Sequence, residues 1–458
     1  MLESSHATYL KNLVGEGNFY DDPPHLSAYA YDATKERHLP DGVIFARDEH
    51  DVSQILAYCN THKIIVVPRG AGSGFTGGAL SVSGGLVLSL ERMDQILEID
   101  EKNLIARVQP GVINKHFQEV VQKRGLFYPP DPASQDQSTL GGNVSENAGG
   151  MRAAKYGITK DYVMALRAVL PNGDIIRAGK KTIKDVAGFN VAGILIASEG
   201  CLAVITEMTL KLLAQPRLRQ SAMGVFNSIK EAMEAVYKSM ASGVTPVAME
   251  FLDNLTIKAV EQRFNKGLPI EAGAILITQV DGSVPEQISW QLQEIEKHFK
   301  ENGCVDFKIA QTPQEEESLW FSRRNASQSI SIYGKKKLNE DVTVPRASLP
   351  ALLEEVGRIS AEYGFAIPCF GHTGDGNVHV NIMLEDPENQ LEQGQRAMEA
   401  IFKAAIALEG TLSGEHGIGL SKAKFMPLAF NESEMALFRR IKQAFDPNNI
   451  LNPFKMGL

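Results

Sequence analysis

The spacing of apolar residues predicts alternating helices and strands from about residue 48 onward. Residues 49–62 carry apolar side chains at a helical period, and the apolar run at 64–67 is typical of a buried strand. The turn signal Pro171-Asn172-Gly173-Asp174 lies between two further apolar runs, which are predicted to pair as a hairpin. In all, this part of the chain predicts strands at 64–67, 85–90, 104–108, 165–170 and 175–178.

The pattern changes after Pro216. Helices are then predicted at 229–240, 285–300 and 349–363, and strands at 274–280 and 378–383. Strands followed by helices in this way favour an α+β domain with an antiparallel sheet and helices on one face. We therefore expect three parts: residues 1–216 with a core at about 38–216, residues 217–410, and a C-terminal segment 411–458 that packs back on the first part.

Two glycine-rich stretches in the first part indicate a phosphate-containing ligand. Gly72, Gly74 and Gly77 satisfy the pattern Gly-x-Gly-x-x-Gly, but the residues that follow predict another strand rather than the helix that a Rossmann site requires. Backbone N–H groups of small residues can still hold phosphate; a flexible linker is the alternative. The second stretch lies within 126–157, which is predicted to be a long structureless loop of functional importance.

Composition restricts the partners and the compartment. The 458 residues carry a net charge of -9, which argues against nucleic acid or an anionic membrane as the main partner. The chain has no apolar stretch near the ~20 residues of a membrane span and a polar start, so a cytoplasmic protein is expected. Its four cysteines are scattered, so neither disulfides nor an internal iron–sulfur cluster is expected.

Two motifs near the C-terminal end carry candidate chemistry. Residues 371–379 read Gly-His-Thr-Gly-Asp-Gly-Asn-Val-His, and residues 413–419 read Ser-Gly-Glu-His-Gly-Ile-Gly. Two imidazoles and one carboxylate can bind a divalent metal with an open position, and a further histidine can move a proton. The alternative is a pair of glycine-rich turns with surface histidines.

Together these motifs resemble one flavoprotein family. The loop at 68–78, the stretch from Pro129 to Gly150, and Ser198-Glu199-Gly200 are similar to the FAD-binding domain of the vanillyl-alcohol-oxidase-like, or PCMH-type, flavoproteins. The motifs at 371–379 and 413–419 resemble its FAD-linked D-2-hydroxy acid dehydrogenase branch. The resemblance spans residues 31 to 453 and implies an α+β fold: a PCMH-type FAD-binding domain of two α+β subdomains, followed by an α+β cap domain with an antiparallel sheet.

The resemblance also implies a set of FAD-binding residues. Ser73 stands where some family members attach FAD through a histidine, which implies non-covalent FAD. The implied set is Pro68, Arg69, Gly70, Ala71, Gly72, Ser73, Gly74, Gly77, Gly78, Pro130, Asp131, Ser138, Thr139, Gly141, Gly142, Asn143, Asn147, Gly150, Glu199, Gly200, Ile205 and Asn452.

For the reaction, the resemblance implies a divalent metal, zinc or manganese, held by His372, His379 and Glu415. It makes His416 the base, with a third metal ligand as the alternative role. Arg323, three residues after a tryptophan, would bind the substrate carboxylate, with a solvated surface arginine as the alternative. Further substrate contacts are implied for Asn381 and, on less regular spacing, Lys337 and Ser327.

The implied activity is FAD-dependent oxidation of a 2-hydroxy acid, glycolate or D-lactate, to the 2-oxo acid, with electrons passed to an acceptor other than NAD. A D-2-hydroxyglutarate dehydrogenase, a non-catalytic flavin-binding subunit, a zinc hydrolase and an alkyl-transfer relative are the alternatives. Implied partners are iron–sulfur and flavin subunits, a quinone or cytochrome, or a second copy, with a peripheral place on the inner face of a membrane. The sequence leaves the acid, the metal and the acceptor open.

Overall fold

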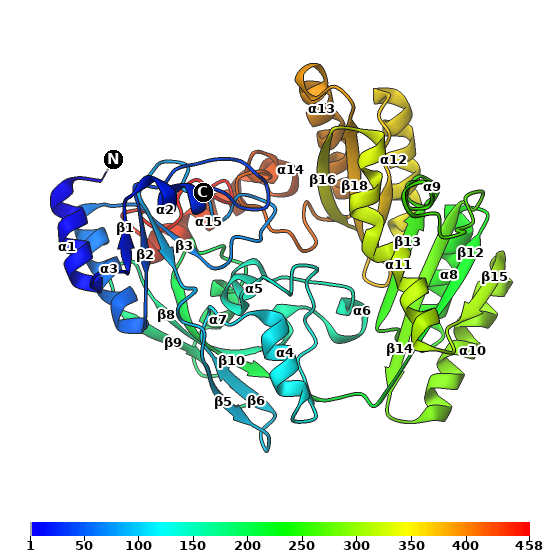
Figure 1. Ribbon diagram of the computed structural model, residues 1–458, viewed down its shortest axis with the longest axis horizontal. Helices are drawn as coiled ribbons and strands as arrows, with labels where there is room; N and C mark the ends of the chain where they lie inside the picture. Colours follow the sequence, from blue (N-terminus) through cyan, green and yellow to red (C-terminus); the bar gives the residue numbers. More distant parts are fainter. Residues whose placement is uncertain (1) are drawn as a thin grey trace. The chain divides into compact units, whose positions relative to one another are not determined.

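A computed structural model describes residues 2–458, which divide into two compact units (Figure 1). Unit 1 comprises Met1–Gly149, Ile158–Gln215 and Glu415–Leu458. Unit 2 comprises Gly150–Gly157 and Pro216–Gly414.

Unit 1 contains a mixed sheet with strand order β1-β2-β4-β3, in which β2 and β3 both run parallel to β4. Its core includes Leu10, Ile44, Ile55 and Leu88, all fully buried. Asp48 caps α3 by accepting a hydrogen bond from the N–H of Asp51. The elements are α1 (Ser4–Val14), β1 (Phe19–Tyr20), α2 (Pro23–Ala28), β2 (Gly42–Phe45), α3 (Glu49–His62), β3 (Val66–Arg69) and β4 (Leu86–Ser89).

A second sheet of unit 1 is antiparallel, with strand order β5-β6-β10-β8-β9. Its strands are β5 (Ile96–Asp100), β6 (Ile105–Val108), β8 (Val163–Val169), β9 (Ile175–Gly179) and β10 (Val204–Lys211). The remaining elements of the unit are α4 (Asn114–Gln122), β7 (Leu126–Phe127), α5 (Leu140–Glu146), η1 (Thr159–Asp161), α7 (Val191–Leu195), β11 (Leu213–Ala214), η4 (Ala423–Phe425), α14 (Met426–Ala429) and α15 (Glu432–Phe445).

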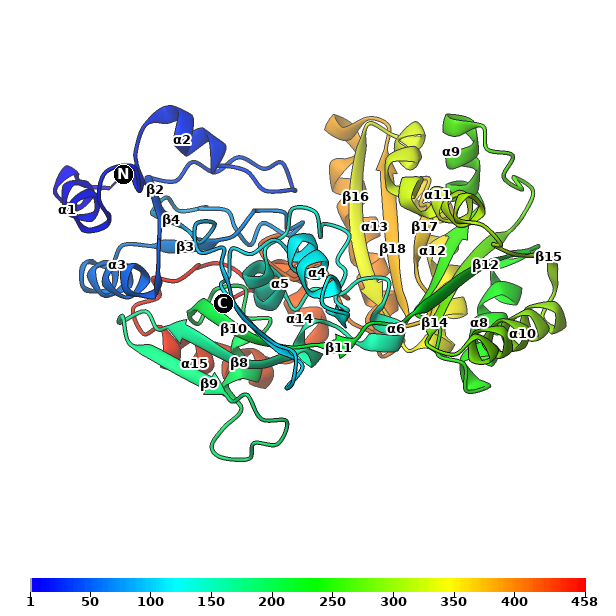
Figure 2. The same cartoon turned by 60° about the horizontal axis from the view of Figure 1, so that its bottom comes forward.

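Unit 2 is built on one antiparallel sheet of seven strands, in the order β15-β12-β14-β13-β17-β18-β16 (Figures 1 and 2). The strands are β12 (Leu218–Phe226), β13 (Ala248–Asp253), β14 (Ala274–Gly282), β15 (Cys304–Ile309), β16 (Lys336–Thr343), β17 (Cys369–His372) and β18 (Asn377–Leu384). The helices are α6 (Ala153–Tyr156), α8 (Ile229–Ala241), α9 (Asn254–Phe264), α10 (Pro285–Glu301), α11 (Pro313–Ser329), η2 (Ile330–Tyr333), η3 (Arg346–Ser348), α12 (Leu349–Tyr363) and α13 (Pro387–Ala407).

Helices cover both faces of this sheet. On one face, Trp320 of α11 donates a hydrogen bond from Nε1 to Ser221 Oγ of β12, 3.0 Å away. On the other face, Phe299 of α10 lies so close to Gly224 of β12 that a Cβ there would come within 2.5 Å of its ring. Successive side chains of a strand point to opposite faces, so α10 and α11 lie on opposite sides. The expectation of helices on one face only was wrong.

The same alternation gathers polar residues at the β16 edge of the α11 face. Glu250 is paired in register with His372, and Asp341 with His379. Asn381 lies two residues after His379 and therefore on the same face. In antiparallel pairs the residues opposite one another lie on one face of the sheet, so these five side chains share a surface.

The α+β fold class is confirmed, as are several helices. The bounds of α3 and α12 match the predicted 49–62 and 349–363. The segment 126–157 is not structureless, because β7, α5 and α6 lie within it. The strand predicted at 64–67 is β3, displaced by two residues to Val66–Arg69.

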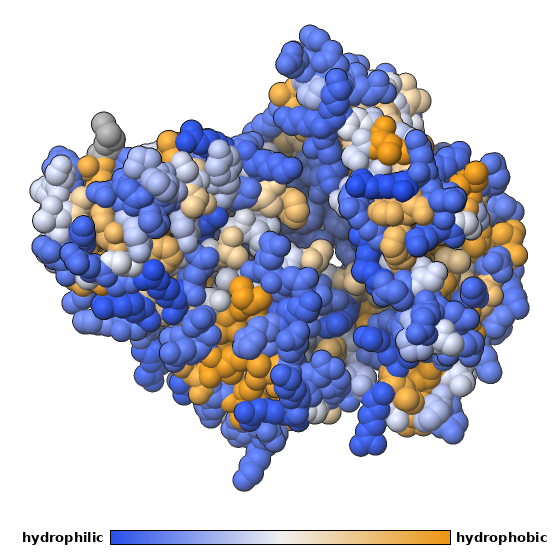
Figure 3. Space-filling view, in the orientation of Figure 1, coloured by the Kyte–Doolittle hydropathy of each residue, from blue (hydrophilic) through white to orange (hydrophobic). Residues whose placement is uncertain are grey.

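The surface shown in Figure 3 is largely hydrophilic, with apolar side chains gathered in smaller patches. Among residues 2–458, no helix combines the length and the apolar character that crossing a bilayer requires.

Candidate functional site

The glycine loop of unit 1 lines a cavity together with α5 and β10. The loop follows β3 directly, and no helix begins after it, as the sequence predicts. Thr139 caps α5 by accepting a hydrogen bond from the N–H of Gly142. Gly70 must lack a side chain here, because a Cβ would come within 2.2 Å of Thr139 Oγ1.

Most of the residues predicted to bind FAD line this cavity. Those that line it are Pro68, Arg69, Gly70, Ala71, Gly72, Ser73, Gly74, Gly78, Ser138, Thr139, Gly141, Gly142, Asn143, Glu199, Gly200 and Ile205. Residues that the sequence reasoning missed are Phe75, Ala79, Leu90, Pro110, Pro132, Ala133, Ser134, Ser145, Glu146, Ala148, Gly149, Ala203 and Val204. Most of these are small or apolar and carry no signal in a sequence.

Six predicted residues do not line the cavity. Gly77, Pro130, Asp131 and Asn147 lie elsewhere in unit 1, and Gly150 belongs to unit 2. The sixth, Asn452, contacts two residues that line the cavity. Its Nδ2 donates hydrogen bonds to the carbonyl oxygens of Gly78 and Glu199, at 2.9 and 2.7 Å. It therefore holds two segments of the cavity in place.

The cavity wall contains buried polar atoms that have no hydrogen-bond partner among residues 2–458. They are Nε and Nη1 of Arg69, Oγ of Ser138, Nδ2 of Asn143 and Oε2 of Glu146. Buried polar groups are nearly always hydrogen-bonded in folded proteins. Three donor-bearing side chains without acceptors therefore fit a large polar ligand with acceptor oxygens, as a dinucleotide has.

Two buried glutamates line this cavity, and the pKa of each is raised. Burial raises the pKa of Glu199, and the hydrogen bonds that it accepts from the backbone N–H groups of Ile418 and Gly419, both at 2.7 Å, offset only part of that rise. Burial, and next the negative charge of Glu199, raise the pKa of Glu146 well above its usual range. The raised pKa of Glu146 favours its neutral carboxylic acid form, which can donate a hydrogen bond.

In unit 2, the two histidines of the first motif stand on adjacent strands. His372 ends β17 and His379 lies on β18, and the four-residue turn between the strands brings their rings to a centroid distance of 5.3 Å. Both side chains are buried. The turn containing Asp375 and Gly376 thus directs both imidazoles to one place.

Glu250 of β13, which the sequence reasoning missed, holds two of the predicted residues. Its Oε1 lies 2.7 Å from His372 Nδ1, and its Oε2 accepts a hydrogen bond from Arg323 Nε at 2.5 Å. Burial alone would raise the pKa of Glu250, but His372 and Arg323 hold it below its usual range. An ionised Glu250 favours the proton on His372 Nδ1, so Nε2 is the nitrogen that could bind a metal.

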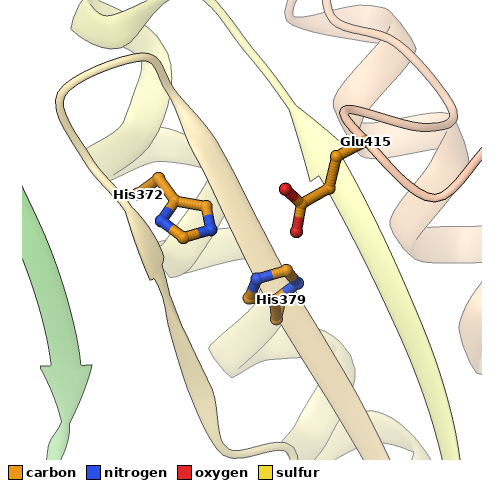
Figure 4. A group of neighbouring side chains, drawn as sticks. All are labelled: His372, His379 and Glu415. Atoms are coloured by element: carbon orange, nitrogen blue, oxygen red, sulfur yellow. The ribbon is translucent and has the colours of Figure 1, made fainter. Parts of the chain in front are cut away.

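Glu415 completes a three-residue cluster with these histidines. One ligand atom from each of His372, His379 and Glu415 lies within 4.8 Å of the others (Figure 4). Glu415 directly follows Gly414, the last residue of unit 2. The backbone N–H of Gly414 donates to Asp341 Oδ2 at 2.9 Å, which fixes the start of the Glu415 segment against β16.

His416 is not part of that cluster. Its Nε2 lies 3.7 Å from Glu415 Oε1, and its ring lies beside Phe75, with centroids 5.3 Å apart. The Oγ1 of Thr76 donates a hydrogen bond to the backbone carbonyl of His416 at 3.2 Å. Glu415 and His416 both line the cavity of unit 1.

The predicted substrate residues differ in their burial and in their hydrogen-bond partners. Arg323 is mostly buried and its guanidinium lies over the Phe370 ring, so it is not the solvated surface residue of the alternative reading. Because Nε is bonded to Glu250, only its Nη groups can meet a carboxylate. Asn381 Oδ1 accepts from Asn339 Nδ2 at 2.7 Å, and Lys337 Nζ donates to Ser327 Oγ at 2.8 Å.

Two family models match the chain. One, described as FAD binding domain, covers residues 40–179, and the other, described as FAD linked oxidases, C-terminal domain, covers residues 215–456. The glycolate oxidase subunit GlcD of Bacillus subtilis (strain 168) is 40% identical over 98% of this chain and 95% of its own length. A D-lactate dehydrogenase of Anaerostipes hadrus is 34% identical over 91% and 89%.

Among solved structures, p-cresol methylhydroxylase with substrate bound is similar in fold. It superposes with a TM-score of 0.82 at 18% identity, covering 99% of this chain and 96% of that one.

Proposed function

Because this chain belongs to the family of FAD-linked oxidases, we propose that it oxidises a 2-hydroxy acid to the 2-oxo acid with the help of a divalent metal. The proposed metal ligands are His372, His379 and Glu415. The observation that carries the proposal is the convergence of three ligand atoms within 4.8 Å. Relatives named glycolate oxidase subunit and D-lactate dehydrogenase support glycolate or D-lactate as the substrate.

Non-covalent FAD fits the residues of the unit 1 cavity. When bound, FAD supplies the acceptor for the hydride that leaves C2 of the acid. Arg69 and Asn143 present donors suited to its phosphate and ring oxygens, and the neutral Glu146 adds a further donor. Ser73 offers a hydroxyl rather than an imidazole at the position of the covalent link in other family members.

The donor set of the proposed metal site suits a catalytic cation. Two imidazoles and one carboxylate leave coordination positions open, and zinc, manganese or iron all accept this set. When bound, the metal supplies Lewis acidity that makes the substrate hydroxyl easier to deprotonate. Glu250 fixes the ring orientation and the tautomer of His372 for this role.

Other side chains would bind and deprotonate the substrate. His416, adjacent to Glu415 in the chain, is the proposed base that takes the hydroxyl proton. The Nη groups of Arg323 would pair with the substrate carboxylate, while Glu250 keeps the guanidinium in place. Asn381 and Lys337 are proposed as further substrate contacts. Each of them also forms a hydrogen bond with a neighbouring side chain.

The proposed electron acceptor is a quinone, a cytochrome or a partner iron–sulfur protein. All four cysteines of the chain, Cys59, Cys201, Cys304 and Cys369, are free thiols in the structure, and three are buried. Relatives named as subunits of a glycolate oxidase support partner subunits, which we propose here as well.

Anaerobic titration of the flavin-loaded protein tests the substrate class. We expect the visible flavin absorbance to bleach on adding D-lactate or glycolate, and the panel includes L-lactate and D-2-hydroxyglutarate. In protein from which a chelator has removed the metal, the flavin should stay bound but should bleach more slowly. Failure of every 2-hydroxy acid to bleach the flavin would refute the proposal.

The metal ligands have a separate test. His379→Ala should abolish turnover and weaken metal binding, because it removes one of three ligands, while flavin content stays at the wild-type level. His116→Ala, on the exposed surface of α4, is the matched control and should change neither. A His379→Ala protein with wild-type turnover would remove the metal site from the proposal.

A further inference from the structure

The segment between β9 and α7 exposes large apolar side chains to an unusual degree. Every residue from 180 to 190 is exposed, and we name this segment the exposed loop. Ile183 is 94%, Val186 100% and Phe189 94% exposed. Figure 2 shows the loop reaching away from β8 and β9. Isolated apolar residues are common on protein surfaces, but three large ones within seven positions with almost no contact to the protein mark an interaction site.

Neighbouring residues extend this apolar character to both ends of the loop. Ile175 of β9 is 44% exposed and Ile194 of α7 is 39% exposed. The loop is therefore not a solvated linker, for which polar and glycine residues are typical. The apolar side chains are most readily explained by a surface that covers them in use.

The exposed loop carries a net positive charge, whereas the whole chain carries a net negative charge. It contains Lys180, Lys181 and Lys184 against the single acidic residue Asp185, whereas the whole chain has a net charge of -9. Lys181 forms an ion pair with Glu98 at 2.9 Å, and Asp185 accepts a hydrogen bond from the N–H of Ala187. Within residues 2–458 no ion pair involves Lys180 or Lys184, so both are available to an anionic partner.

We propose that the exposed loop docks this protein on the surface of an anionic lipid bilayer. Apolar side chains would enter the boundary between headgroups and acyl chains, and the lysines would reach lipid phosphates, as in peripheral membrane proteins. A bilayer can receive apolar side chains that are not held in a fixed arrangement. The side chains of this loop are not held by packing, because no residue of the loop is buried. A protein partner would instead require anchors supported by neighbouring side chains.

The net negative charge of the chain does not prevent this contact. At physiological ionic strength, charges more than about 8 Å from the membrane surface are largely screened, so the lysines of the inserted loop dominate. The inference is independent of the proposed reaction, since it uses no residue of the cavity or of the metal cluster. It places the protein beside lipid-soluble electron acceptors.

Vesicle co-sedimentation of the flavin-loaded full-length protein tests the inference. The probes are vesicles of phosphatidylcholine alone and of phosphatidylcholine mixed with phosphatidylglycerol. The wild type should bind the mixed vesicles more tightly, and the difference should shrink at about 1 M salt, where screening extends to ~3 Å.

Three variants identify the surface that binds. Serine at Ile183, Val186 and Phe189 together should weaken partitioning by at least about a hundredfold, since burying each large apolar side chain contributes about tenfold. Glutamine at Lys180 and Lys184 should weaken binding to the mixed vesicles only, by about fivefold per lysine. Val305→Ser, which removes a half-exposed apolar residue of β15, is the control and should bind like the wild type.

Two outcomes would overturn the inference. Wild-type protein that ignores both vesicle types excludes a lipid surface. Vesicle binding that survives the triple serine variant assigns the contact to another surface. If size exclusion instead shows a wild-type dimer that the triple variant breaks, the occupant of the loop is a second copy. Flavin content and melting temperature should be unchanged in every variant, so loss of binding cannot reflect unfolding.

Discussion

Glu250→Gln keeps the shape of this buried side chain and removes its charge, so it tests what the charge contributes. Glu250 is fully buried and serves two partners at once, accepting from Arg323 Nε and lying 2.7 Å from His372 Nδ1. Glutamine has nearly the same volume, but only one of its two terminal atoms accepts a hydrogen bond. One of the two partners therefore loses its acceptor.

The expected loss has two parts. Removing one charge of a buried ion pair typically costs about 3–5 kcal/mol of folding free energy, and the lower end applies here because the amide keeps one hydrogen bond. Losing the carboxylate that orients a metal-binding histidine typically lowers metal affinity by about 10- to 100-fold, equivalent to about 1.4–2.7 kcal/mol. We expect Glu250→Gln to show both effects, with flavin content unchanged because the unit 1 cavity is intact.

The assay is a metal titration of the chelator-treated protein against a chromophoric competitor, beside a thermal melt and a flavin spectrum. Glu354→Gln removes a charge from an exposed position of α12 and is the matched control, expected to behave like the wild type. Glu250→Asp, which keeps the charge, covers the case in which Glu250→Gln does not fold. Wild-type metal affinity in a folded Glu250→Gln protein would refute the role assigned to this carboxylate.

Two further predictions concern the cavity and the sheet. Gly70→Ala should reduce FAD retention, because its Cβ would come within 2.2 Å of Thr139 Oγ1; Gly357→Ala, with open space around it, should not. Burial raises the pKa of Asp253 from 3.8 to about 6, so the folded protein holds this proton more tightly than the unfolded chain. The stability that it contributes is thus full below about pH 4 and falls by ~3 kcal/mol in all as the pH rises through 6, and urea titrations should show that Asp253→Asn lacks this dependence.

Local patterns were sufficient for the long helices but not for the glycine-rich segment. The bounds of α3 and α12 follow from apolar spacing over four turns, which needs no distant partner. By contrast, α5 begins with Leu140-Gly141-Gly142, a poor helix sequence on propensity. Its formation depends on the Thr139 cap and on close packing against Pro110, where a Cβ on Gly141 would come within 2.5 Å. Such contacts across 30 residues leave no trace in a local pattern.

The candidate site likewise contains residues that local sequence motifs indicate and a residue that they do not. Glycine-flanked motifs led to His372, His379 and Glu415, because each motif is short and chemically unusual. Glu250 was missed because it lies 122 residues before His372 in a strand of mostly apolar residues. A lone charged residue within such a run was the available signal, and it becomes specific only when strand order places β13 beside β17.

Strand register explains why the motifs at 371–379 and 413–419 lie close together. Asp341 is the register partner of His379 across β16 and β18, so both side chains stand on one face at the same level of the sheet. Asp341 also accepts hydrogen bonds from Ser413 Oγ and the N–H of Gly414, which precede Glu415. A shift of β16 by one residue would turn Asp341 to the opposite face and release this segment. The spacing of the three proposed ligands from two motifs therefore depends on an aspartate that belongs to neither motif.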